Sequence, residues 1–262
     1  MSPNGYQVEV LKPNGATEAG EQLAASHAEY PAFRAVVPDQ EKRRRFLRSF
    51  MTTAARDAAK FSEPLIARDD EGLLGGWCGM PLCRSAARRA ARKDARRRRT
   101  RGGAPRRRTQ RAVMTGRRDV GHVFHTSLLG VALWMKPGSF PQSTLRKAAM
   151  TPGLLRVAMI LGSKFPSFAR MGAALERTHP GDRSWYLQAM GVHPRAQRRG
   201  VGKALIEPVL VIADEEGLPV HLHTSDPANI AYYQRYDFRV TDPSISVFSN
   251  GPTYTAMTRR PL

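Results

Sequence analysis

Cysteine is scarce in this sequence, because its 262 residues include only two, Cys78 and Cys83. Neither has a further cysteine or a histidine at zinc-ligand spacing, so we expect no disulfide and no metal site. No apolar run approaches the ~20 residues that a membrane-spanning helix needs, and the first residues lack an apolar signal core. The expected location is the cytoplasm, with no membrane partner.

Aromatic residues are absent from Cys78 to Val123, and acids are nearly absent there too. Between Arg84 and Arg118, sixteen lysines and arginines stand against one acid, Asp94. The whole chain has 42 basic and 22 acidic residues, so most of its formal charge of +20 lies in this segment. The excess of positive charge therefore lies mainly in this segment, and the rest of the chain has similar numbers of basic and acidic residues.

Three interpretations of this Arg-rich stretch are open. It is a nucleic-acid- or ribosome-binding arm held by phosphate neutralisation, or a solvated, self-repelling loop, or the product of a frame slip in a GC-rich gene. The missing aromatics count against a specific RNA surface and leave weak, nonspecific nucleic-acid binding. We treat residues 77–121 as an Arg-rich disordered insertion or frame-slip segment between 1–76 and 122–262.

The remaining sequence alternates between strand-like and helix-like patterns, and its hydrophobic content of 41% is enough for a core. Prolines at Thr151-Pro152 and Phe165-Pro166 predict two breaks in a helical region, residues 143–178. Strands are predicted at Tyr6–Leu11, in 63–76 and 122–134, at Trp185–Val192 and at Pro252–Arg260, and further helices at Ala16–His27 and Glu41–Lys60.

A glycine turn follows the strand Trp185–Val192. Its spacing is Gln197-x-x-Gly200-x-Gly202, with basic residues inside and after it, and a helix pattern opens on the turn. Free backbone N–H groups and the helix dipole would both point at an anion bound there. The turn lacks the Gly-Lys-Ser/Thr ending of a P-loop and is too short for a dinucleotide fingerprint. We therefore predict that it binds a phosphate group.

This turn resembles the acetyl-CoA loop of the GNAT superfamily of N-acetyltransferases, where a strand ending in Val-x-Pro precedes it, here Val192-His193-Pro194. The run from Leu222 to Phe238 resembles the second half of the same site. In its residues this run is most similar to the puromycin N-acetyltransferase group, and so is the segment Tyr30-Pro31-Ala32. The resemblance covers nearly the whole chain except residues 77–121.

The resemblance implies an α/β GNAT fold, with a mixed, mostly antiparallel sheet and helices on both faces. The sheet is expected to splay near Val192 and His223, so that acetyl-CoA enters the gap. Main chain of the strand would bind the pantetheine arm and offer an N–H to the thioester carbonyl, while the glycine turn would hold the pyrophosphate. The residues implied in cofactor binding are Ala189, Met190, Gly191, Val192, Gln197, Arg198, Arg199, Gly200, Val201, Gly202, Lys203, Asn229 and Tyr233.

Tyr233 is the general-acid candidate, because it stands four residues after Asn229, as the family's tyrosine does. An ordinary phenol stays protonated near neutral pH and can protonate a departing thiolate. Tyr232 is expected to point elsewhere on the helix, and Tyr236 to be a packing residue. Asp226 is expected to cap the helix and to have no catalytic role.

The general base is less clear from the sequence. Similar enzymes of the puromycin group carry Glu in a Leu-Glu-Thr-Ser run, and here His223 takes that place. A histidine is a competent base near neutral pH, but His223 could equally fill the position while a water relays the proton. His221 shares the strand face of His223, which indicates either a paired site or a polar face. Glu176 and His179 are candidates without motif support.

Two further expectations concern conformation and the acceptor. Asp237 stands where relatives have glycine, so this position is expected to be left-handed. Met150, Met159 and Met171 either line an adaptable substrate pocket or fill gaps in the core.

The predicted function is transfer of acetyl from acetyl-CoA to a primary amine of a small molecule, such as an aminonucleoside or an antibiotic-like compound. Attack is expected to be direct, without a covalent enzyme intermediate or a metal, in a monomer or homodimer. One alternative is a nucleic-acid- or ribosome-associated protein that uses the Arg-rich segment. Another is a degenerate acetyltransferase without activity.

Overall fold

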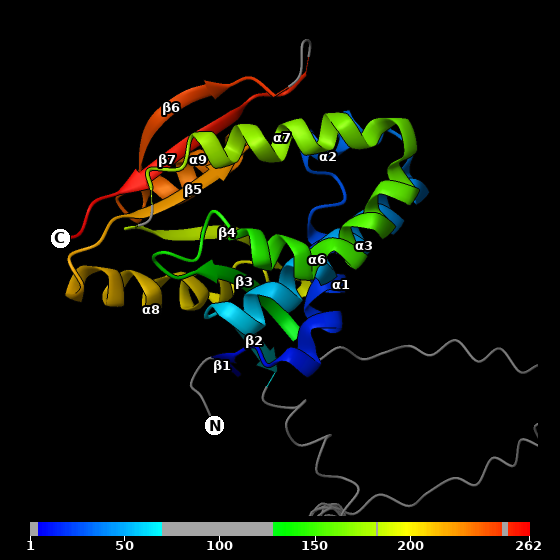
Figure 1. The fold of residues 1–262 in the computed structure, drawn as a ribbon. Helices are drawn as coiled ribbons and strands as arrows, with labels where there is room; N and C mark the ends of the chain where they lie inside the picture. The colour runs from blue at the N-terminus through cyan, green and yellow to red at the C-terminus, as the bar shows by residue number, and fades with distance from the viewer. Residues whose placement is uncertain (1–4, 70–127, 182, 248–250) are drawn as a thin grey trace, which may run out of the picture. The chain divides into compact units, whose positions relative to one another are not determined.

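Seven strands of the described residues form one sheet in the order β1-β2-β3-β4-β5-β7-β6 (Figure 1). This computed structural model describes residues 5–69, 128–181, 183–247 and 251–262. The predicted Arg-rich segment, the turn of 63–76 after Asp69 and the first part of the strand predicted in 122–134 lie outside these residues. The strands are β1 (Tyr6–Val10), β2 (Leu65–Asp69), β3 (Leu128–Met135), β4 (Trp185–Val192), β5 (Val220–Thr224), β6 (Arg239–Ile245) and β7 (Tyr254–Arg259).

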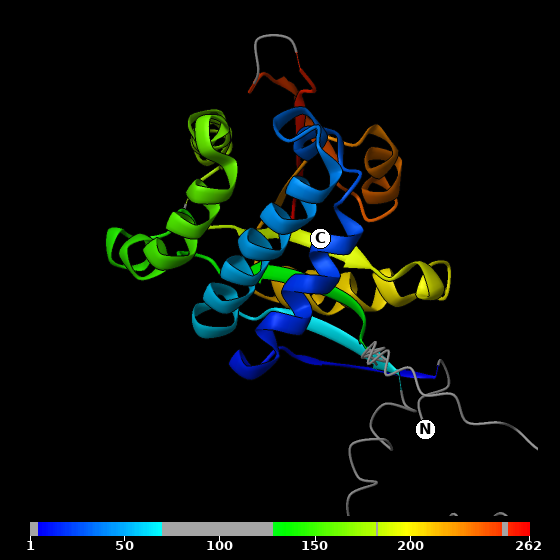
Figure 2. The same ribbon diagram turned by 90° about the vertical axis from the view of Figure 1, so that its right-hand side faces the viewer.

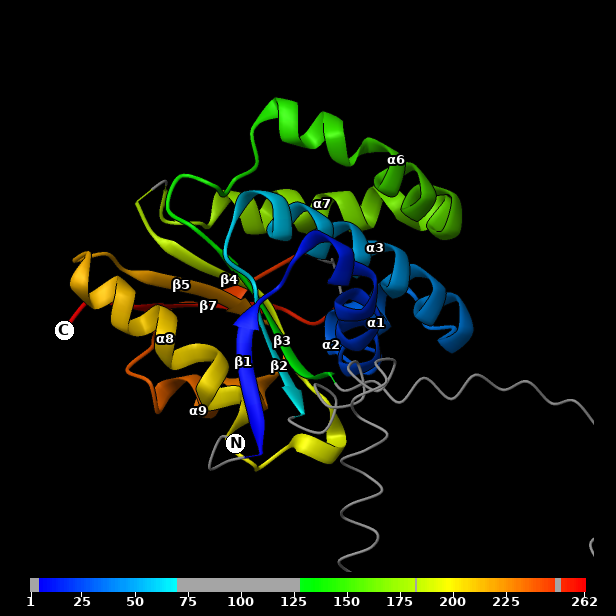
Figure 3. The same ribbon diagram turned by 90° about the horizontal axis from the view of Figure 1, so that it is seen from below.

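Helices cover both faces of the sheet, as predicted (Figures 2 and 3). The helices are α1 (Ala16–Ser26), α2 (Pro31–Val36), α3 (Gln40–Phe61), α6 (Thr144–Leu161), α7 (Phe165–Arg177), α8 (Val201–Glu215) and α9 (Pro227–Gln234). The first five pack on one face, and α8 and α9 on the other. All eight residues of β3 are buried, because a strand covered on both faces has no solvent side. Leu133 points into one core and Trp134 into the other.

The sheet opens in its middle. The described strand pairs are antiparallel except β4 with β5, which run parallel and pair only from Trp185 with Val220 to Leu187 with Leu222. Beyond Leu187 β4 keeps its pairing with β3, but its other edge has no β5 partner. The two strands therefore separate where the sequence predicts a splayed sheet.

A bulge in β4 lies at the start of this opening. Leu133 pairs with Ala189 and Trp134 with Leu187, so Gln188 is an extra residue without a counterpart in β3. An extra residue bends its strand and re-aims the neighbouring side chains. The bulge thus helps to turn the end of β4 away from β5.

Small residues let the helices approach the sheet closely. A Cβ on Gly191 would lie 2.0 Å from the Ser26 hydroxyl oxygen at the end of α1. A Cβ on Gly130 would lie 2.9 Å from both Val201 and Leu205 of α8. The Trp134 indole N–H also donates a 2.9 Å hydrogen bond to the Leu205 carbonyl. The contacts of Gly130 and Trp134 hold the N-terminal half of α8 against β3.

The predicted break at Thr151-Pro152 is wrong, because α6 continues through Pro152 as one helix. The exposed proline leaves the freed carbonyl open to water. Beside it α6 packs tightly on α3, where a Cβ on Gly153 would lie 2.3 Å from the Thr53 hydroxyl oxygen. The second predicted break is confirmed, since α7 begins at Phe165. The helix α2 and the strand β6 were not predicted.

Asp237 has a φ of 63°, as expected from its place in the sequence. A non-glycine residue in the left-handed region of backbone conformation destabilises the folded state by about 1–2 kcal/mol, and aspartate by somewhat less. Asp237→Gly should therefore raise the free energy of unfolding by about 0.5–1 kcal/mol, measured by urea denaturation. Asp237→Ala should lower the free energy of unfolding, because alanine has no more backbone freedom than aspartate and lacks a side chain that can hydrogen-bond to the local backbone. The reverse order would contradict a strained backbone at this position.

Candidate active site

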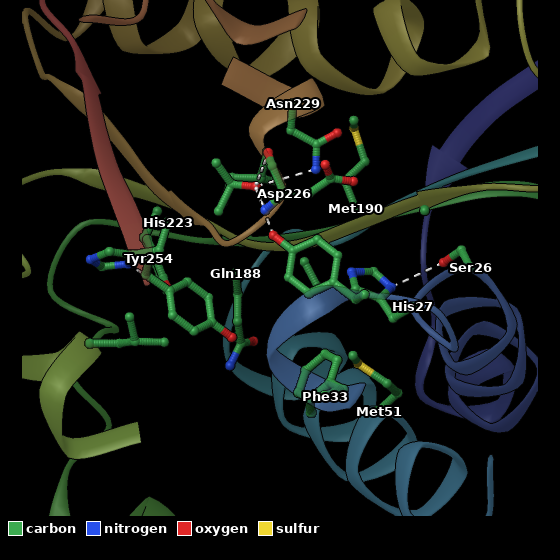
Figure 4. Close-up of a pocket in the computed structure, with 18 of the residues that line it drawn as sticks. Ser26, His27, Phe33, Met51, Gln188, Met190, His223, Asp226, Asn229 and Tyr254 are labelled. Atoms are coloured by element: carbon green, nitrogen blue, oxygen red, sulfur yellow. Dashed lines mark hydrogen bonds between the residues drawn. The ribbon is translucent and has the colours of Figure 1, made fainter. Parts of the chain in front are cut away.

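The gap between β4 and β5 belongs to a cavity of about 1270 Å³ (Figure 4). One half is walled by the end of β4, the glycine turn and α9, and the other by α3, α6, α7 and Tyr254 of β7. Arg199 and Val201 do not line it, and Val201 is fully buried under β3. The predicted site residues on its wall are Ala189, Met190, Gly191, Val192, Gln197, Arg198, Gly200, Gly202, Lys203, His223, Asn229 and Tyr233.

The glycine turn has the backbone of an anion site. Gly200 is the N-cap of α8, with φ 83°, and Arg198 is also left-handed, with φ 62°. The first N–H groups of α8 have no carbonyl partner within the helix, and its first turn has no acidic residue. Lys203 lies beside this end and pairs with Glu207 at 3.3 Å. Free donors, the helix dipole and basic side chains therefore face the same half of the cavity.

Tyr232 does not point away from the site, contrary to expectation. It lines the same cavity as Tyr233, and its hydroxyl oxygen would lie 2.5 Å from a Cβ on Gly202. The guanidinium of Arg235 stands 4.8 Å from the centre of the Tyr232 ring. Gly202 thus provides the space in which α9 packs against the first turn of α8. Tyr236, predicted as a packing residue, also reaches the cavity wall.

Tyr233 is 7% exposed and packs its ring against Phe238 at 5.8 Å. Burial, reinforced by Tyr30 and Tyr232, raises the pKa of Tyr233 well above its usual value. The phenol is therefore protonated throughout the neutral and mildly alkaline range. Helix α9 holds it in place, because Asp226 accepts a 3.0 Å hydrogen bond from the Ala228 N–H, consistent with its predicted role as the helix cap.

His223 and His221 form a contact pair on β5. The two Nε2 atoms are 3.3 Å apart, and His223 Nε2 also lies 2.8 Å from the Thr178 hydroxyl. Burial, followed by the nearby His179, lowers the pKa of His223 to about 4. Burial, followed by His223 and His179, lowers the pKa of His221 to about 2. Both rings are therefore neutral at pH 7.

These histidines predict a specific loss of stability in acid. Their folded-state pKa values lie below the usual 6.5, so the unfolded chain binds more protons and unfolding becomes easier as the pH falls. Stability should be level above about pH 6.5 and fall between pH 6.5 and 4, by up to about 1.4 kcal/mol per pH unit for each histidine. Urea denaturation at pH 7.5, 6 and 5 measures this slope. A His223→Gln variant should show a shallower one, and an unchanged slope would contradict the assignment.

The other half of the cavity is largely apolar and aromatic. Its only ion pair among the described wall residues joins Lys147 to Glu176 at 2.9 Å, which leaves little net charge there. Met150 and Met171 line this half, whereas Met159 is 77% exposed and takes no part in it. The apolar wall is completed by Phe33, Phe50, Met51, Leu154 and Phe168.

Gln188 was not predicted as a site residue. Figure 4 shows its side chain projecting into the cavity between Tyr254 and Phe33. Its amide oxygen is buried and has no hydrogen-bond partner among the described residues. A buried acceptor without a partner is rare in a folded protein and calls for an explanation. The bulge that places Gln188 there depends on the pairing with β3, which the local sequence does not reveal.

Tyr30 connects the N-terminal helices to the end of β5. Its hydroxyl accepts a 2.8 Å hydrogen bond from the Ser225 N–H and lies 2.7 Å from the Thr224 hydroxyl. Asn229 donates to that same Thr224 oxygen at 3.3 Å. These bonds fix the β5 wall of the opening. The sequence resemblance includes Tyr30-Pro31-Ala32 but gives no role for it.

Residues 165–240 match the family model of the acetyltransferase (GNAT) domain. The fold is a GNAT acetyltransferase fold. An uncharacterized N-acetyltransferase of Schizosaccharomyces pombe is 32% identical over 120 residues, or 42% of this chain and 47% of the relative. The chain thus aligns with about half the length of that curated relative.

Two solved structures with the GNAT fold are similar over nearly their whole length. A histone acetyltransferase HPA2 and related acetyltransferase from Corynebacterium glutamicum has a TM-score of 0.58 at 17% identity, covering 98% of this chain and 97% of its own. An agmatine N-acetyltransferase has a TM-score of 0.51 at 12% identity, covering 97% and 99%. At such identities the likeness establishes the GNAT fold alone.

Within the described part of the chain, no cluster of three His, Cys, Asp or Glu residues has the geometry to hold a metal ion. Across the same residues, no helix combines the length and apolarity needed to cross a membrane.

Proposed function

We propose that this chain transfers an acetyl group from acetyl-CoA to a primary amine of a small molecule. The observation that carries the proposal is that one cavity joins the edge of β4 that has no β5 partner to the N-terminus of α8. An acetyl-CoA molecule needs an anion site for its pyrophosphate and hydrogen-bonding main chain for its pantetheine arm. The described residues offer both in one continuous wall.

The residues present fit acetyl-CoA on two counts. The main chain of Ala189 to Val192 lies along the edge of β4 that has no β5 partner, which suits strand-like binding of an amide-containing arm. The turn from Gln197 to Lys203 has free N–H donors and basic neighbours, which suit the pyrophosphate. A main-chain N–H of β4 directed at the thioester oxygen would stabilise the negative charge that develops there.

The acid–base chemistry is assigned to two side chains. The acceptor attacks as a free amine, so one proton must leave its ammonium form before attack and another must reach the departing sulfur. Tyr233 donates the latter proton, because burial keeps its phenol protonated and it lines the cofactor half of the cavity. His223 lines the cavity as a neutral imidazole and takes the base role.

The acceptor half of the cavity indicates an amine with an apolar body. Aromatic and methionine side chains form most of this wall, and its described charges pair with each other. The free amide oxygen of Gln188 is placed to accept a hydrogen bond from an N–H or O–H of the acceptor. An aminonucleoside or antibiotic-like amine of the puromycin type has these features, which agrees with the resemblance of the run from Leu222 to Phe238.

The test has a binding step and a turnover step. Acetyl-CoA should bind the purified full-length chain, raise its thermal midpoint and give acetylated product by mass spectrometry with an aromatic-bodied amine. A polyamine as long as the aromatic-bodied amine should have a kcat/KM at least about tenfold lower, because the apolar wall has no partners for its extra positive charges. Absence of both binding and product would refute the proposal.

A Gln188→Leu variant separates the two halves of the site. It should raise the KM for the amine about tenfold, as expected for one lost hydrogen bond, while leaving acetyl-CoA binding unchanged. Gln197→Leu, in the glycine turn, is the matched change on the cofactor side and should weaken acetyl-CoA binding instead, with the KM for the amine unchanged. The nucleic-acid alternative depends on residues outside the described structure, so no observation in the described structure favours it.

A further inference from the structure

A second cavity lies on the far side of the histidine pair. It measures about 940 Å³ and is lined by His221 and by residues of β6 and β7, among them Thr241, Asp242 and Thr258. His223 lines the cavity of about 1270 Å³, called the acceptor cavity from here on, and does not line the second one. His221 lines the second cavity and does not line the acceptor cavity. The two rings in contact therefore connect two separate cavities.

The hydrogen bonds around His223 are compatible with a proton on its Nε2. The Thr178 hydroxyl has one proton, and when it donates that proton to the Ala174 or Leu175 carbonyl, at 3.3 and 3.1 Å, its oxygen accepts from His223 Nε2 at 2.8 Å. In this arrangement His223 Nε2 is protonated, and its Nδ1 accepts from the Tyr186 hydroxyl at 3.3 Å. Tyr186 lines the acceptor cavity, and burial keeps its pKa far above the usual value.

The same reasoning extends to His221. Its Nε2 faces the protonated Nε2 of His223 at 3.3 Å and must therefore be an acceptor. Its proton then resides on Nδ1, which donates to the Thr258 hydroxyl at 2.9 Å. Thr258 in turn lies 3.5 Å from the Thr241 hydroxyl at the exposed surface. Every donor in this chain points the same way, from the acceptor cavity to the second cavity.

We propose that Tyr186, His223, His221 and Thr258 pass a proton through the sheet from the bound acceptor to solvent in the second cavity. This inference rests on the proposed acetyl transfer. The acceptor ammonium gives one proton to the Tyr186 oxygen as Tyr186 gives its own to His223 Nδ1. His223 passes its Nε2 proton to His221, and His221 passes its Nδ1 proton through Thr258 to water. The remaining amine proton, lost during attack, replaces the proton that Tyr233 gives to sulfur, so one proton is released for each turnover.

The surroundings suit a pathway that holds no lasting charge. His179 stands 5.3 Å from the His221 ring and disfavours a charge on it, while Asp242 attracts a proton towards the second cavity. The other charged groups on the wall of that cavity are Asp237, Arg239 and Arg260. Neither neutral imidazole holds an additional proton stably, so the transferred proton continues to solvent. The route lets the acceptor lose its proton while both substrates are bound.

The first test needs no substrate. Nitrogen-15 NMR of the free protein at pH 7.5 distinguishes the two neutral tautomers of each histidine. We expect Nε2–H for His223 and Nδ1–H for His221, with His223→Gln and His221→Gln used to assign the signals. The opposite tautomer at either ring would overturn the proposal, whatever the activity of the protein.

The second test is the pH profile of acetyl transfer with the amine found active. His221→Gln should lower kcat about 10- to 100-fold at pH 7, leave the KM for acetyl-CoA unchanged, and approach the parent near pH 10, where the free amine already predominates. Thr258→Val should act in the same direction without disturbing the buried ring. Thr255→Val on the same strand is the control, because its hydroxyl donates to the Pro243 carbonyl and takes no part in the path.

Equal losses at pH 7 and pH 10 would indicate a structural defect, and an unchanged profile would show that the path is not used; both results overturn the proposal. If the parent protein binds acetyl-CoA but acetylates no amine, the proposed function fails, while the NMR result still decides the tautomers.

Discussion

Gly200→Asp should weaken acetyl-CoA binding at least about 100-fold, a loss of about 2.7 kcal/mol. The new carboxylate would stand at the N-cap of α8, where the proposed pyrophosphate meets the free N–H groups, and would repel it at close range. A left-handed φ of 83° adds about 1–2 kcal/mol of strain to the folded state. Calorimetric titration with acetyl-CoA measures the affinity, and thermal denaturation without ligand measures the strain separately.

Gly217→Asp is the matched control for this experiment. Gly217 also has a positive φ, 64°, and follows the same helix at its other end, with open space around it. The same substitution there brings similar strain and the same charge but lies away from the cavity. It should lower the thermal midpoint by a similar amount and leave acetyl-CoA affinity within about threefold. Equal weakening by both variants would place the cause in general destabilisation and refute an anion site at the glycine turn.

Tyr233→Phe should lower kcat about 10²- to 10⁴-fold, the usual contribution of a positioned general acid, without changing the acetyl-CoA dissociation constant. The change removes one oxygen and keeps the ring packed on Phe238. Because burial raises the pKa of Tyr233, ionisation of this phenol should not reduce the parent's activity up to about pH 10. Steady-state kinetics across pH 6 to 10, beside calorimetric titration, measures both quantities.

Tyr236→Phe provides the comparison. It lies on the same cavity wall and should change kcat less than about threefold. If Tyr233→Phe kept its kcat while Tyr232→Phe lost it, the general acid would be Tyr232, which the structure also brings to the cavity beside Gly202.

Local patterns in the sequence were enough to predict β4, the glycine turn and α8, and α9 was predicted from the family resemblance together with its local cap. Each of these elements is encoded by neighbouring residues: an apolar run, two glycines at fixed spacing, and an aspartate cap followed by proline. The strand β6 escaped prediction because Asp242-Pro243 in its middle is typical of a turn. Among the described strands β6 is an edge strand that pairs with β7 alone, so it tolerates the proline, and its register shifts at Asp242.

The acceptor side could not be predicted for a different reason. The free amide of Gln188 results from a mismatch between β3 and β4, strands separated by about fifty residues of chain. The orientation of the histidine pair depends on Thr178 from α7 and Thr258 from β7. Such contacts come from the assembled sheet, and residue types along one segment do not determine them.

Arg68 and Leu128 are paired neighbours on β2 and β3, although almost sixty residues separate them in the chain. The two described segments on either side of residues 70–127 therefore meet the sheet at adjacent positions. The entropy of closing a loop grows only with the logarithm of its length, about 0.6 kcal/mol for each doubling. An unusual composition between these two residues, whatever its origin, is thus compatible with an intact sheet, and this junction is the natural place to shorten the chain or to insert a second folded unit.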